Sequence, residues 1–220
     1  MFSPKNKIKL IIVGDNYTGK TAIIGKYFYN DYKNDTKIEY YTKIVNNIKV
    51  DTWDIKGGVP FIKISETYIQ DANAFILLFD ITDKSSFINI SAWIERINNN
   101  MKIHNNNNYY PILLLGNKSD LSNERQVLYS EAKKFAKDNK LLYLETSIYD
   151  ENRIISCIDT YVTNVYNFIY NDQKDISNMI FMDKDNNKIM KSSKSIEEIS
   201  IENDNYKKKQ KCCNYLCYIL

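Results

Sequence analysis

The sequence predicts an α/β fold in which helices cover both faces of a mostly parallel, six-stranded sheet. Short apolar runs alternate with segments of helical period up to about residue 170. One pair of strands is joined by Asn46-Asn47, a tight-turn sequence that predicts a single antiparallel edge strand. From about residue 171 the apolar period ends and Asp, Asn, Lys and Ser dominate, which predicts a largely disordered tail. We therefore divide the chain into a domain of residues 1–170 and a tail of residues 171–220.

The individual elements follow from the change of hydrophobic period along the chain. Strands are expected over residues 8–13, 39–45, 48–53, 74–81, 111–116 and 141–145. Helices are expected over residues 20–29, 86–101, 129–138 and 151–170, and residues 60–71 have room for a short one. In the first helix, Ile23, Ile24, Tyr27 and Phe28 share one face, which we expect to be buried.

The composition excludes several classes of protein. With a net charge of only +3 over 220 residues, the chain has no compositional basis for general nucleic-acid binding. Three of the four cysteines lie in the last nine residues, where they cannot cross-link a core, so nothing indicates an oxidising compartment. No apolar run reaches membrane-spanning length and the N-terminus has no signal-peptide core, so we expect a cytosolic chain.

The first site motif is Gly14-x-x-x-x-Gly19-Lys20-Thr21, directly after the expected strand 8–13. This is the spacing of a P-loop, whose glycines let backbone N–H groups converge on phosphate at the start of a helix. Lys20 is expected to contact the β and γ phosphates, and the Thr21 hydroxyl to bind Mg²⁺. The phosphate-binding residues are then Gly14, Asp15, Asn16, Tyr17, Thr18, Gly19, Lys20 and Thr21. A plain strand-to-helix turn is the alternative, and the flanking strand and helix argue against it.

The second motif is Asp54-x-x-Gly57, at the end of the expected strand 48–53. The carboxyl ends of parallel strands share one edge of the sheet, so this motif should lie beside the P-loop. We expect Asp54 to hold the Mg²⁺ shell and Gly57 to offer its N–H to a γ-phosphate. Taken alone, Asp-x-x-Gly is commonly only a turn, and its position is what makes it meaningful.

The third motif is Asn117-Lys118-x-Asp120, which ends the expected strand 111–116. A carboxylate at Asp120 can accept both N–H groups on the edge of guanine, whereas adenine presents no such donor pair. The aliphatic stem of Lys118 can cover the face of the base. The motif therefore predicts a guanine nucleotide and argues against a nucleotide kinase, which the P-loop alone would allow.

In order and spacing, these motifs resemble those of the Ras-superfamily small GTPases, and of the Rab branch in particular, over about residues 7–170. Rab-like stretches include Trp53-Asp54, the run from Gly57 to Tyr68, the run from Leu78 to Phe87, Trp93, and Glu145-Thr146-Ser147. The resemblance implies that Ser147 and the backbone of Ile148 contact guanine. It also implies an effector-facing apolar patch of Trp53, Tyr68 and either Tyr40 or Tyr41. Trp53 as a plain core residue is the alternative.

The resemblance implies a molecular switch that cycles between GDP and GTP, with Mg²⁺, on membranes. Such a switch recruits effectors in vesicle trafficking and has an exchange factor, a GTPase-activating protein and a Rab escort or GDI-like chaperone as partners. It would reside on the cytoplasmic face of an intracellular membrane, with a cytosolic pool and no nucleic-acid partner.

The sequence departs from the family pattern at several site positions. Gly58 stands where the family has the glutamine that orients the attacking water, which predicts slow hydrolysis. Tyr17 replaces a very small P-loop residue and is expected to crowd the phosphates, and Tyr149 alters the guanine side. The threonine that would bind Mg²⁺ in the GTP state is expected to be Thr36, with Thr42 as the alternative. A GTP-binding adaptor without useful hydrolysis is the second functional hypothesis.

The extreme C-terminus reads Cys217-Tyr218-Ile219-Leu220, a C-a-a-X box whose final leucine favours a geranylgeranyl group. One lipid gives only reversible membrane binding, so a second signal is expected. The lysines of residues 207–211, or palmitoylation of Cys212 or Cys213, would provide it. A solvated basic tail with unmodified thiols is the alternative.

Overall fold

In the computed structural model, the described residues are 6–29, 39–54, 68–104 and 110–170, with two short strands beyond them. One sheet contains six strands in the order β2-β3-β1-β4-β5-β6. These strands are β1 (Lys7–Val13), β2 (Glu39–Val45), β3 (Ile48–Asp54), β4 (Ala74–Asp80), β5 (Ile112–Asn117) and β6 (Leu142–Glu145). β2 pairs antiparallel with β3 and every other pairing in this sheet is parallel, so the predicted fold is confirmed.

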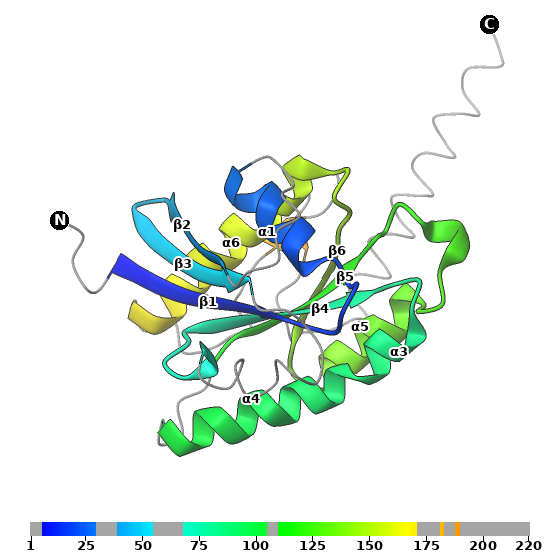
Figure 1. The fold of residues 1–220 in the computed structure, drawn as a ribbon, viewed down its shortest axis with the longest axis horizontal. Coiled ribbons are helices and arrows are strands. Elements are labelled where there is room, and N and C mark those ends of the chain that lie inside the picture. The colour runs from blue at the N-terminus through cyan, green and yellow to red at the C-terminus, as the bar shows by residue number, and fades with distance from the viewer. Residues whose placement is uncertain are drawn as a thin grey trace, which may run out of the picture.

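Helices cover the sheet on both sides (Figure 1). The helices α1 (Lys20–Tyr29) and α6 (Glu151–Tyr170) pack on one face and share a buried apolar cluster with the strands. A second cluster on the other face includes residues of α3 (Lys84–Ile88), α4 (Ile90–His104) and α5 (Tyr129–Asp138). All seven residues of β4 are buried, as expected for a central strand covered on both faces.

The β2–β3 hairpin turns at Asn46 and Asn47, as predicted. Both residues have positive φ angles, 49° and 64°, which a type I′ turn requires. The turn fixes the register of the two strands, so that Tyr40 lies opposite Trp53 and Thr42 lies opposite Asp51. This register bears on two of the alternatives that the sequence left open.

The single helix expected over residues 86–101 is wrong, because the structure has two helices with Asn89 between them. α3 starts early because the Asp83 carboxylate accepts the N–H of Ser85 at 2.9 Å and caps it. The N–H of Asn89 closes α3 on the carbonyl of Ser85 at 3.0 Å, while its side chain donates to Asp15 at 2.6 Å. Apolar residues keep a helical spacing on both sides of Asn89, so the sequence pattern does not indicate the break.

The strand ends differ from the expected ones by at most one residue, and the structure adds a short 3₁₀ helix, η3 (Ser122–Glu124), that the sequence did not predict. Of the range 60–71, in which a short helix was expected, residues 68–71 are described: Tyr68 and Ile69 are helical, and Gln70 and Asp71 form a turn. Beyond α6, the structure describes only β7 (Phe181–Met182) and β8 (Lys188–Ile189), which pair antiparallel. The prenylation box, the lysines before it and most of the tail lie outside the described part, so their disorder and lipidation stay predictions.

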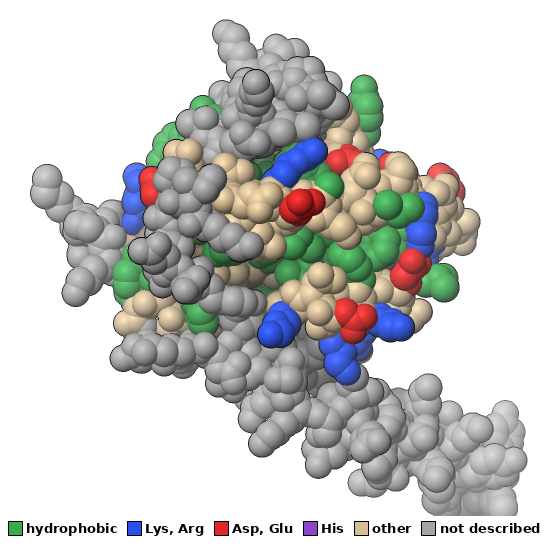
Figure 2. Space-filling view, turned by 90° about the horizontal axis from the view of Figure 1, so that it is seen from below, with side chains coloured by type: hydrophobic (Ala, Val, Ile, Leu, Met, Phe, Trp, Pro, Cys, Tyr) green, Lys and Arg blue, Asp and Glu red, His purple; other side chains and the backbone are tan. Residues whose placement is uncertain are grey.

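Charged side chains of both signs are interspersed on the face shown in Figure 2, with apolar side chains between them. Among the described helices, none has the length and apolar character needed to span a membrane.

Candidate functional site: a P-loop joined to a guanine motif

The P-loop backbone has two positions that only glycine fills without strain. Gly14, after β1, has a φ of 152° and Gly19, before α1, has a φ of 96°. A Cβ at Gly14 would lie 2.1 Å from the carbonyl oxygen of Leu78, and one at Gly19 would lie 2.3 Å from Asn117 Nδ2. The close approach at Gly19 brings the phosphate loop directly against the guanine motif.

Lys20 is the first residue of α1 and its side chain is buried. Its Nζ donates to the carbonyl oxygen of Asp15 at 2.6 Å. Burial lowers the pKa of Lys20 to about 8, while the negative charges of Asp54 and Asp15 act in the opposite direction. A buried ammonium group at a helix start, within a glycine-bounded loop, is placed to receive an anion.

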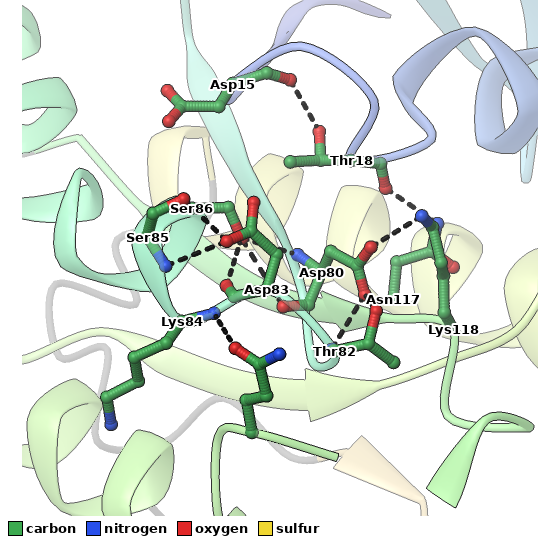
Figure 3. Close-up of polar contacts among 11 residues, drawn as sticks. Asp15, Thr18, Asp80, Thr82, Asp83, Lys84, Ser85, Ser86, Asn117 and Lys118 are labelled. Carbon is green, nitrogen blue, oxygen red and sulfur yellow. Dashed lines mark hydrogen bonds and ion pairs between the residues drawn. The ribbon is translucent and has the colours of Figure 1, made fainter. Parts of the chain in front are cut away.

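Asn117 joins the P-loop to the end of β5. Its Nδ2 donates to the carbonyl oxygen of Thr18 at 2.9 Å, and the Thr18 hydroxyl in turn donates to the carbonyl of Asp15 at 2.9 Å (Figure 3). Among the described residues, none hydrogen-bonds the buried Oδ1 of Asn117 or the buried Oγ1 of Thr146. Buried polar atoms are normally paired, so this end of the site offers two atoms that a ligand or water can satisfy.

Thr21 and Asp54 form a pair of oxygen ligands beside the P-loop. The Thr21 hydroxyl donates to Asp54 Oδ2 at 2.6 Å, and Asp54 is buried at the end of β3. The parallel register places Asp54 beside Ile12, two residues before the loop begins. A hydroxyl and a carboxylate are ligands that suit Mg²⁺. Among the described residues, no group of three or more His, Cys, Asp or Glu side chains could hold a metal ion.

The alternative switch threonine, Thr42, lies in β2 opposite Asp51. Side chains alternate between the two faces of a strand, so Thr42 faces the side opposite to Asp54, which pairs with Glu39. This placement favours Thr36 as the switch threonine. Thr36, Gly57 and Gly58 all lie in stretches that the structure does not describe, and their roles stay predictions.

The guanine motif leaves one carboxylate open. Lys118 has a φ of 64° and its ammonium pairs with Asp80 Oδ2 at 2.5 Å. The other oxygen of Asp80 accepts from the N–H and hydroxyl of Thr82 at 2.8 and 2.7 Å, so Asp80 is held at the end of β4 (Figure 3). Asp120 is exposed, so its carboxylate is accessible to a ligand.

The loop after β6 lies against the guanine motif. Ser119 donates its N–H to the carbonyl of Thr146 at 3.1 Å, and Thr146 donates its own to Gly116 at 2.8 Å. Ser147 is buried and Ile148 is half-buried. The structure therefore brings the two expected base-contacting segments together.

A partly buried ion pair that the sequence did not reveal supports this loop. Arg125 binds both carboxylate oxygens of Glu145 at 2.8 Å, and the Tyr143 hydroxyl donates to the same carboxylate at 2.5 Å. The hydrogen bond to Glu145 raises the pKa of Arg125. Arg153 donates its Nε to the Glu145 carbonyl at 2.8 Å. No spacing in the sequence marks these partners, since Arg125 and Glu145 meet only when β6 joins the sheet.

Two departures from the family pattern are visible in the described part of the site. Tyr17 has a φ of 65° and is 92% exposed, so its ring projects from the P-loop into solvent. Tyr149 is 82% exposed, and its N–H donates to the Ser147 hydroxyl oxygen at 3.2 Å. Whether Tyr17 crowds bound phosphates remains a prediction.

An aromatic patch lies at the β2–β3 edge. The ring of Trp53 lies 5.1 Å from that of Tyr40 and 5.9 Å from that of Tyr68, measured between centroids. Tyr40 is half exposed, whereas Tyr41 is buried in the core on the opposite face, so Tyr40 is the member from β2. Trp53 also packs against the second apolar cluster. Its placement therefore fits both a role in the effector-facing patch and a role as a core residue.

Comparisons with known proteins agree with this geometry. Residues 9–167 match the model of the family described as the Ras family. Ras-related protein Rab-11B of Dictyostelium discoideum is 32% identical over 170 residues, which are 74% of this chain and 73% of that protein. Ras-related protein Rab11A of Lotus japonicus is 31% identical over 73% of each chain, and human Ras-related protein Rab-17 is 33% identical over 63% of this chain and 67% of its own. The chain belongs to the Ras family and is a divergent small GTPase of the Rab type.

Proposed function

We propose that this chain is a Rab-type switch that binds GDP and GTP with Mg²⁺, hydrolyses GTP slowly and recruits effectors to a membrane in vesicle trafficking. The observation that carries the proposal is the hydrogen bond from Asn117 to the carbonyl of Thr18, at 2.9 Å. It joins a phosphate-binding loop to a guanine-reading motif, and a single nucleotide would span both.

The residues divide the work of binding. Lys20 and the P-loop N–H groups would bind phosphate oxygens, and Asp120, Ser147 and Ile148 would bind the base. Thr21 and Asp54 would hold Mg²⁺, together with Thr36. When bound, Mg²⁺ would neutralise charge on the β and γ phosphate oxygens. Gly58 offers no side chain to orient water, so the slow step is the attack on the γ-phosphate.

The same glycine favours a second candidate function, a GTP-binding adaptor that hydrolyses no useful amount of nucleotide. Such a protein would be regulated by exchange or by lipidation. Both candidates share the nucleotide site, and only a measurement of turnover separates them.

Partners follow from the switch mechanism. An exchange factor and a GTPase-activating protein would act at the nucleotide site, and effectors would contact the patch of Tyr40, Trp53 and Tyr68. A Rab escort or GDI-like chaperone would carry the lipidated tail. The location proposed is the cytoplasmic face of an intracellular membrane, with a cytosolic pool.

The metal site offers the direct test of nucleotide binding. Thr21→Ala removes the hydroxyl beside Asp54, so bound GDP should lose the stabilisation that Mg²⁺ confers. We expect the wild-type affinity for fluorescent GDP to fall on adding a chelator, and the Thr21→Ala affinity in Mg²⁺ to match that lower value. Thr42→Ala is the matched control, because Thr42 lies on the other face of the sheet, and it should keep the full Mg²⁺ effect. Equal Mg²⁺ dependence in both variants contradicts the assignment.

The lipid anchor is tested separately. Cys217→Ser should move the full chain from the membrane to the soluble fraction of cells, since each lysine contributes only about 1 kcal/mol near an anionic surface. Cys213→Ser is the matched control for loss of a neighbouring thiol and should retain membrane association at a reduced level. A Cys217→Ser protein that stays on membranes would place the anchor elsewhere, with Cys212 and Cys213 the first residues to test.

A further inference from the structure

Asp15 is the one acidic residue of the P-loop, and both of its carboxylate oxygens are held from outside the loop. Asn89 Nδ2 donates to Oδ2 at 2.6 Å, and the indole N–H of Trp93 donates to Oδ1 at 2.9 Å. Asn89 occupies the break between α3 and α4, and Trp93 lies one turn into α4 with only 4% of its surface exposed. We call these three residues the Asp15 tether.

The backbone carbonyl of Asp15 makes hydrogen bonds within the phosphate loop. Its carbonyl oxygen accepts from the Thr18 hydroxyl at 2.9 Å and from Lys20 Nζ at 2.6 Å. Figure 3 shows the carboxylate directed away from the carbonyl oxygen that Thr18 contacts. One residue therefore connects the phosphate-binding ammonium group to the start of α4.

A carboxylate in a loop that binds phosphate raises an electrostatic problem. Like charges repel, and a freely rotating Asp15 side chain could approach the phosphates and compete for Lys20. Two hydrogen bonds to a charged acceptor are strong enough to fix the side chain in one position. The tether thus keeps a negative charge away from the anion site and fixes the peptide that carries the Lys20 acceptor.

We propose that Asn89 and Trp93 are positioning residues for the bound nucleotide, acting through Asp15 to hold the P-loop in its phosphate-binding conformation. This inference rests on the proposed nucleotide binding. The Asn89 side chain that contacts the loop lies at the residue between α3 and α4.

Trp93 has a packing role that must be separated from this one. Its ring belongs to the second apolar cluster and Arg96 lies 5.1 Å from its centroid. Trp93→Phe keeps an aromatic ring in the core but removes the indole N–H that donates a hydrogen bond to Asp15. We expect the dissociation rate of fluorescent GDP in Mg²⁺ to rise about tenfold. Asn89→Ala, at an exposed position that leaves the core intact, should raise it by a smaller factor of about three.

Tyr161→Phe is the matched control for loss of a buried aromatic donor. The Tyr161 hydroxyl donates to the carbonyls of Phe75 and Pro111 at 2.9 Å each, in the cluster on the opposite face of the sheet. This variant should lower the thermal midpoint while leaving GDP dissociation unchanged. If Trp93→Phe behaves in the same way, Trp93 is only a core residue and the proposal is overturned.

A double-mutant cycle tests whether Trp93 affects GDP release through Asp15. Asp15→Ala removes the acceptor, so adding Trp93→Phe to it should not accelerate GDP release further. Independent effects that multiply in the double variant would overturn the tether. Wild-type protein that binds no GDP would instead overturn the proposed function, whereas wild-type binding with unchanged release from Trp93→Phe overturns the tether alone.

Discussion

Replacing Asp120 with asparagine is expected to lower the affinity for GTP by about a thousandfold. The Asp120 carboxylate is exposed, so its oxygens are accessible to the two N–H donors of guanine. Two charge-assisted hydrogen bonds contribute about 2 kcal/mol each, and 1.4 kcal/mol corresponds to a factor of ten in affinity. Equilibrium competition against fluorescent GDP measures the change.

The same substitution should transfer preference to a xanthine nucleotide, whose edge presents an acceptor to the new amide donor. Glu124→Gln is the matched control, since it also removes one exposed carboxylate close to the guanine motif. It should leave the affinity for GTP unaltered. Asp120→Asn protein that still prefers GTP would show that another group reads the base.

Gly58→Gln is expected to raise the intrinsic rate of GTP hydrolysis about tenfold, which is about 1.4 kcal/mol of barrier. An in-line attack requires a water held against the γ-phosphate, and glycine has no side chain that can hold it. Single-turnover phosphate release from preloaded GTP measures the rate. Gly58→Ala is the control, because it stiffens the backbone without adding an amide, and it should give no gain.

Tyr17 is expected to limit the gain in hydrolysis rate that Gly58→Gln gives. Its φ of 65° is unfavourable for a bulky residue by about 1 kcal/mol, so Tyr17→Gly should relieve strain as well as remove the ring. The double variant with Gly58→Gln should hydrolyse GTP faster than either single variant. Wild-type turnover that no substitution increases would mean that another residue positions the water. In that case Gly58 would not explain slow hydrolysis.

Strong hydrophobic periods made much of the fold predictable. The helices at residues 20–29, 129–138 and 151–170 have the bounds that the apolar spacing predicts, and so does the strand Glu39–Val45. The break at Asn89 was not predictable from local sequence, and the Asn89 side chain there donates to Asp15, 74 residues earlier in the chain. Local sequence carries no information about such a partner.

In the site, too, some features could be predicted from the sequence and others depend on contacts between distant residues. The motif spacings predicted which segments meet at the edge of the sheet, because parallel strands end together there. The choice between Tyr40 and Tyr41 needed the hairpin register and the burial of each ring. The Arg125–Glu145 pair and the Asp15 tether each depend on packing between distant segments, so no spacing rule could have identified them.

The most direct test of the central claim is competition by unlabelled GTP and ATP for fluorescent GDP bound to the full-length wild-type chain in Mg²⁺. The geometry of Asn117 and Asp120 predicts displacement by GTP at concentrations at least a thousandfold below those needed with ATP. Displacement by ATP and GTP at similar concentrations would contradict a guanine site and, with it, the account of this protein as a guanine-nucleotide switch.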